Sequence, residues 1–177
     1  MKILEIKTLK GPNYWSVRRP KLIQMKLDLE EMEQRPTNEI PGFRERLEKL
    51  LPSLYEHHCS EDVPGGFFHR VDEGTWMGHV IEHVALEIQT LAGMDTGFGR
   101  TRSVVNEPGV YYVVFSYMEE DAGVYAAKAS VNIVQALVDD LFACRPTDFE
   151  PREGSVLRTV PLVITLAGFC RIRENAW

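Results

Sequence analysis

The stretch GHVIEHVALEIQTL, residues 78–91, decides the fold, because its apolar residues recur at helical spacing. The apolar stripe consists of Val80, Val84, Ile88 and Leu91. Thr75 or Asp72 can cap the start of such a helix, and Gly93 can end it. The pattern therefore predicts a helix that ends near Leu91 and buries one face.

Strand signals lie on both sides of this helix. Residues 3–9 and 21–29 alternate between apolar and polar side chains and predict two antiparallel strands ahead of it. Residues 103–106 and 110–117 follow the helix and predict a hairpin that turns at residues 107–109. The last of these segments is rich in valine and aromatic residues, which favour the pleated surface of a sheet.

The remaining periodic segments predict two further helices. A helix that opens near Gly42 carries leucines on one stripe, and Pro52 is expected to kink or split it. Residues 59–73 are rich in turn signals and predict a loop, and residues 119–143 predict a long alanine-rich helix. The order β-β-α-α-β-β-α predicts an α+β fold: a two-layer sandwich with a mixed or antiparallel sheet covered by helices.

Composition narrows the class of protein. A chain of 177 residues suits one domain, and its net charge of −6 argues against non-specific binding to nucleic acid. No apolar run reaches the length of a membrane span. The early Glu5 is atypical of a signal peptide, and the three cysteines show no disulfide spacing. We therefore expect a cytoplasmic protein without a membrane or nucleic-acid partner, and the sequence leaves homo-oligomerisation open.

The same helix carries the motif H-x-x-E-H at residues 79–83. Residues four apart lie one above the other on a helix, so His79 and His83 can present two imidazoles to one zinc ion. Glu82 shares that side of the helix and is expected to act as the general base that activates a water molecule. This order of residues is a known metallohydrolase signature. The alternative is a pair of half-buried histidines that hydrogen-bond to Glu82 or to the backbone.

The third ligand is predicted to be a carboxylate, because peptidases of this kind use two histidines and one acid. Glu119 and Glu120 are the preferred candidates and Glu150 is a weaker one, although acids also favour the first turn of any helix because of its dipole. The neighbouring His57, His58 and Cys59 are interpreted as a helix end, because adjacent histidines on a helix diverge.

Several blocks of the chain resemble the N-terminal domain of cyanophycin synthetases. They are residues 2–6, 11–16, 78–89, 91–94, 97–102 and 109–115, and they occur in the family's order. The resemblance covers about residues 1–157, and residues 158–177 form a divergent tail. It implies that the ligase domains, which use ATP and magnesium, are not part of this chain; no G-x-x-x-x-G-K-[ST] phosphate loop occurs in it.

The resemblance implies two roles around cyanophycin, a poly-aspartate with arginine on each side chain. One is a zinc-dependent endo-hydrolase that generates primers, and the other is a non-catalytic module that holds the polymer; an inert fragment is a third reading. Arg100 and Arg102, on a predicted glycine-rich loop, are expected to bind the polymer's carboxylates, unless they are merely solvated charges. Trp76 is expected to line the pocket or to pack in the core.

Overall fold

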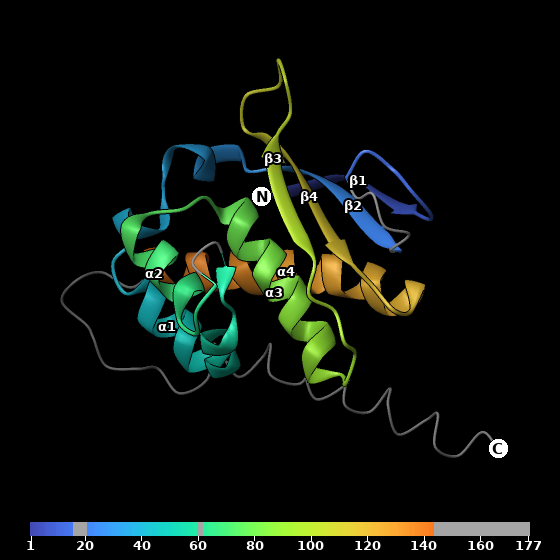
Figure 1. Ribbon diagram of the computed structural model, residues 1–177. Coiled ribbons are helices and arrows are strands. Elements are labelled where there is room, and N and C mark those ends of the chain that lie inside the picture. Colours follow the sequence, from blue (N-terminus) through green and yellow to red (C-terminus); the bar gives the residue numbers. More distant parts are fainter. Residues whose placement is uncertain (16–20, 60–61, 144–177) are drawn as a thin grey trace.

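The computed structural model describes residues 1–15, 21–59 and 62–143, and its framework is a four-stranded sheet (Figure 1). The strands are β1 (Lys2–Leu9), β2 (Leu22–Asp28), β3 (Gly99–Ser103) and β4 (Val110–Ser116). They lie in the order β1-β2-β4-β3, and every neighbouring pair is antiparallel. The apolar strand β4 is central, as expected for the segment with the highest β propensity, whereas the polar β3 forms an edge.

One face of the sheet carries the core. Side chains alternate along a strand, so Ile23, Met25 and Leu27 of β2 share a face with Val113 and Phe115 of β4. All of these side chains are fully buried. This face therefore needs a second layer, as in a two-layer sandwich.

Two long helices supply that layer. Helix α3 (Met77–Leu91) packs against β3 and β4, and helix α4 (Glu120–Ala143) packs against β1 and β2. The two helices also contact each other, so together they cover the core face (Figure 1). The predicted α+β sandwich is confirmed, and its sheet is antiparallel throughout the described residues.

A group of short helices lies between β2 and α3 in the chain. It comprises η1 (Glu30–Gln34), η2 (Thr37–Glu39), α1 (Phe43–Leu50), η3 (Pro52–Glu56) and α2 (Gly66–Glu73). Pro52 separates α1 from η3, so the expected split at this proline is confirmed.

The predicted loop at residues 59–73 is wrong in its second half, which forms α2. Gly65 precedes this helix with a φ of +84°, a conformation that glycine adopts without strain. Phe67, Phe68 and Val71 then anchor the helix in the core. Within the described residues, the regular helices and strands therefore follow the order β-β-α-α-α-β-β-α, with α2 added to the predicted elements.

The structure also moves two boundaries near the motif. Strand β3 begins at Gly99 rather than at residue 103, so Arg100 and Arg102 lie on an edge strand and not on a loop. Helix α3 begins after Trp76, and no side chain caps its first turn. The expected cap residue Thr75 contacts His79 instead, and Asp72 lies within α2.

Among the described residues, none of the helices is both long enough and apolar enough to cross a membrane. The predicted domain boundary at residue 157 and the tail at residues 158–177 lie outside the part of the chain that the structure describes.

Candidate metal centre

Helix α3 brings the two histidines of the motif together as predicted. The ring centroids of His79 and His83 lie 4.8 Å apart at an interplanar angle of 80°. His83 is buried and His79 is partly buried. Burial lowers the pKa of His79 to about 4 with a contribution from the nearby Arg70, and it lowers the pKa of His83 well below its ordinary value. Both imidazoles are therefore neutral at neutral pH, which is the form that binds metals.

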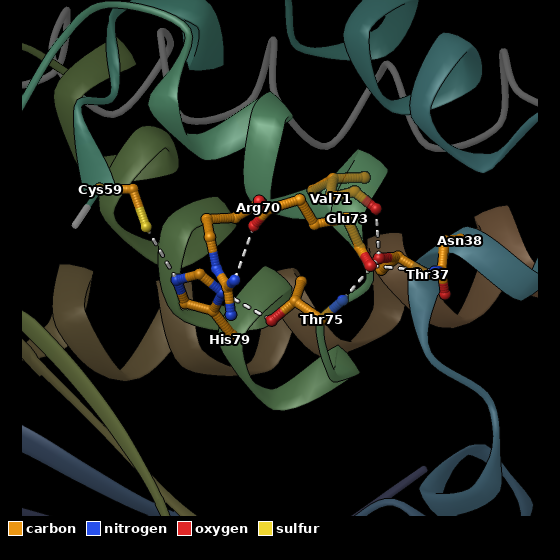
Figure 2. A network of polar contacts seen from close by, with 8 residues as sticks. All are labelled: Thr37, Asn38, Cys59, Arg70, Val71, Glu73, Thr75 and His79. Carbon is orange, nitrogen blue, oxygen red and sulfur yellow. Dashed lines mark hydrogen bonds and ion pairs between the residues drawn. The ribbon is translucent and has the colours of Figure 1, made fainter. Parts of the chain in front are cut away.

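Cys59 joins the two histidines, as Figure 2 shows for the contact with His79. Its Sγ lies 3.4 Å from Nε2 of His79, and one ligand atom from each of Cys59, His79 and His83 falls within 4.8 Å of the others. Cys59 has a φ of +53°, which is uncommon for a residue with a side chain. The sequence interpretation placed Cys59 at a helix end and therefore did not identify it as a candidate metal ligand.

This donor set fits zinc. Sulfur and imidazole nitrogen are the preferred zinc ligands, and catalytic zinc sites use three protein ligands with one open position. Tetrahedral bonds of the usual lengths place a sulfur and a nitrogen ligand about 3.6 Å apart. The separation of 3.4 Å between Cys59 and His79 is close to that value.

The structure does not bring the predicted acidic ligands to this centre. Glu120 forms an ion pair of 2.8 Å with Lys10, which follows β1 at the edge of the sheet opposite β3. Among the described residues that line the pocket around the histidines, neither Glu119 nor Glu120 occurs. The first turn of α4 therefore places its acids where the helix dipole favours them, far along the sheet from His79. Glu150 lies outside the described residues.

A polar network fixes His79 from the other side (Figure 2). Its Nδ1 lies 2.9 Å from the hydroxyl oxygen of Thr75. The backbone N–H of Thr75 donates to the hydroxyl oxygen of Thr37 at 2.9 Å, and the Thr37 hydroxyl donates to the carbonyl of Val71 at 2.6 Å. Nε2, on the other side of the His79 ring, is thereby directed toward Sγ of Cys59.

Glu82 lies on the same helix in a different environment. It is only 6% exposed, and this burial raises the pKa of its carboxyl group to about 7, although Thr101 and Arg100 oppose the shift. The Thr101 hydroxyl donates to Oε2 at 2.6 Å. A side chain at position 99 would collide with this group, because a Cβ there would lie 2.8 Å from Cδ of Glu82. Gly99 thus leaves the space that the carboxyl group occupies, with Oε1 on that side.

The three candidate ligands and Glu82 line one open pocket of about 800 Å³. It is lined by Cys59, His79, Glu82 and His83 together with Arg70, Trp76, Arg100, Arg102 and Tyr111. The three residues predicted to bind substrate, Trp76, Arg100 and Arg102, are thus brought to the same pocket as the motif. A metal ligand set, a carboxyl group near its titration point and guanidinium groups can together bind an anionic or zwitterionic substrate and hydrolyse it.

Comparisons with known proteins agree on one family. The protein-family model described as the cyanophycin synthase-like N-terminal domain matches residues 24–139 of this chain. The chain is 59% identical over 138 residues to the cyanophycin synthetase of Geminocystis herdmanii, and 59% identical over 139 residues to that of a Synechocystis strain. Each alignment covers 78% of this chain but only 16% of the relative, so the chain spans about a sixth of the length of these relatives. The chain belongs to the family of cyanophycin synthase-like N-terminal domains.

Proposed function

We propose that this domain is a zinc-dependent endo-hydrolase of cyanophycin that generates primers for its synthesis. The observation that carries the proposal is the meeting of Cys59, His79 and His83 with the buried Glu82 in one open pocket. A zinc ion held by these ligands would act as a Lewis acid, which polarises a carbonyl group and makes water more acidic. The name of the relatives supplies the polymer as the substrate.

The hydrogen bond from Thr101 supports a role in proton transfer for one particular oxygen atom of Glu82. Oε2 accepts the hydrogen bond from Thr101, which leaves Oε1, on the side of Gly99, to accept a proton from the attacking water. The protonated carboxyl group then returns this proton to the amine that leaves when a backbone amide bond breaks. A pKa of about 7 suits both directions of transfer at neutral pH.

The charges around the pocket match a polymer that carries both signs. Arg100 and Arg102 line the pocket from the edge strand and can pair with the polymer's carboxylates, whereas Glu56 and Asp62 line it with groups that can accept its guanidinium groups. Because the pocket is open and bounded by an edge strand, a chain can pass through it without presenting an end.

The test combines metal analysis with a release assay. The purified domain is expected to contain about one zinc per chain, and to release soluble oligomers from insoluble cyanophycin. Glu82→Gln should retain the zinc and lose the release, because an amide cannot accept the proton. Glu107→Gln, an exchange of the same kind at an exposed turn, serves as the matched control. A Glu82→Gln variant that released oligomers at the parent rate would show that Glu82 is not the base.

A non-catalytic role in polymer retention is the second candidate. It is favoured by the placement of Arg100 and Arg102 on an edge strand beside the pocket. This role predicts that the polymer is retained without release, that retention weakens as salt is added, and that His79→Gln leaves it unchanged.

A further inference from the structure

We propose that Glu87 and His57 position the metal ligand His83, through a chain of hydrogen bonds that runs from Glu87 to His57 and from His57 to His83. The inference rests on the proposed zinc site and extends it to residues that do not touch the metal. It gives a role to His57, which the sequence interpretation set aside as a helix end.

The chain of contacts is continuous. Oε2 of Glu87 lies 2.9 Å from Nε2 of His57, and Nδ1 of His57 lies 2.9 Å from Nδ1 of His83. The other carboxylate oxygen of Glu87 accepts a hydrogen bond from the hydroxyl of Ser53. Glu87 follows His83 by four residues on α3 and therefore lies on the same face of the helix.

The burial of Glu87 needs an explanation. Its residue exposure is 1%, and a buried carboxylate is costly unless its oxygens are paired. Ser53 and His57 pair both oxygens, so the cost is offset locally. An apolar side chain could fill the same position without needing these two hydrogen-bond partners. The contact of Glu87 with His57 therefore points to a function beyond packing.

The direction of each hydrogen bond in this chain follows from the carboxylate group of Glu87. A carboxylate only accepts hydrogen bonds, so Nε2 of His57 must carry the hydrogen that it donates to Glu87. In a neutral His57, Nδ1 then carries a lone pair and accepts the hydrogen on Nδ1 of His83. His83 is left with an unprotonated Nε2, which is the form that a metal ion requires. Glu87 thus selects the tautomer of His83 through His57.

The same contact also holds the segment that carries the third ligand. His57 precedes Cys59 by two residues, and its carbonyl oxygen accepts a hydrogen bond of 3.2 Å from the backbone of Phe67. The ring of Phe67 stacks on His83 at a centroid distance of 4.3 Å. The pair of Glu87 and His57 therefore joins the helix that supplies two ligands to the loop that supplies the third.

The first test measures zinc affinity by competition with a chromophoric chelator. Glu87→Gln keeps the shape of the side chain but no longer selects one tautomer of His57, and we expect zinc to bind about ten- to a hundredfold more weakly. His58→Gln changes the adjacent, exposed histidine of the same segment and should leave the affinity at the parent value. Equal affinity of Glu87→Gln and the parent domain, or an equal loss in His58→Gln, would overturn the proposal.

The second test needs no variant and therefore does not depend on whether Glu87→Gln folds. Long-range proton–nitrogen spectra of the zinc-loaded parent domain report which ring nitrogen carries a hydrogen. We expect a hydrogen on Nδ1 of His83 and on Nε2 of His57. A hydrogen on Nδ1 of His57, or metal binding through Nδ1 of His83, would refute the assigned order. A parent domain that binds no zinc would refute the proposed function and this inference together, whereas tight zinc binding with the wrong tautomers would refute the inference alone.

Discussion

Replacement of Glu82 by glutamine should stabilise the metal-free domain, and by an amount that depends on pH. The folded structure raises the pKa of Glu82 from an ordinary value of 4.5 to about 7 through burial. The folded state therefore binds this proton more tightly than the unfolded state, and stability is lost as pH rises from 4.5 through 7. Glutamine remains neutral at every pH and can still accept the hydrogen bond from Thr101.

The size of the gain in stability follows from the shift in the pKa of Glu82. Once the carboxyl group is fully ionised, at about pH 8, the shift corresponds to about 3 kcal/mol of lost stability, which Glu82→Gln should restore. At about pH 5 most of the native carboxyl groups are already protonated, and the gain should fall to about 1 kcal/mol. The nearby histidines titrate in both proteins alike, so their contribution cancels in the comparison.

The assay is urea unfolding of the chelator-treated parent and Glu82→Gln domains at the two pH values, followed by circular dichroism. Glu107→Gln serves as the control, because it makes the same exchange at an exposed turn outside the pocket. A gain for Glu82→Gln that did not grow between about pH 5 and about pH 8 would refute the claim that burial holds this group near its titration point.

Three further predictions address the site. Gly99→Ala should reduce cyanophycin cleavage while zinc binding persists, because its Cβ would lie 2.8 Å from Cδ of Glu82 and would displace the base; unchanged release of oligomers would contradict this. Cys59→Ala should weaken zinc binding about tenfold or more, whereas Glu120→Gln, which alters a surface ion pair with Lys10 outside the pocket, should not; the reverse result in a chelator competition would restore the acid as the third ligand. Arg100→Gln with Arg102→Gln should raise the KM for soluble oligomers more than it lowers kcat and should weaken the salt dependence of binding; a change confined to kcat would show that the arginines do not bind the substrate.

The sequence predicted the elements that have a strong period. Helix α3 and strands β2 and β4 carry regular apolar patterns, and the spacing of His79 and His83 followed from the geometry of a helix. Helix α2 was missed because it is short and follows turn-forming residues, and the start of β3 was missed because an edge strand of sequence GRTRS has no apolar alternation.

The proposed third ligand, Cys59, could not be predicted from spacing. Cys59 lies 20 residues ahead of His79 and reaches it only because η3 and α2 fold back onto α3. Glu119 and Glu120, at the start of α4, were the preferred candidates, but a helix dipole favours acids at this position whether or not a metal site is present. One feature of the sequence pointed toward this segment. Glu87 lies on the buried side of the motif helix, and a buried carboxylate needs a hydrogen-bond partner from a neighbouring segment.

Helix α3 belongs to the core as well as to the pocket, and this couples the site to the unfolding of the whole domain. Twelve of its fifteen residues are buried, including Val80, Ile81 and Val84, which contribute to the same core as the sheet. Backbone amides in such a helix exchange with solvent through the most costly opening that the protein undergoes. His79, Glu82 and His83 therefore keep their spacing for as long as the domain stays folded, and we expect a mutation that loosens the core also to loosen the geometry of the pocket.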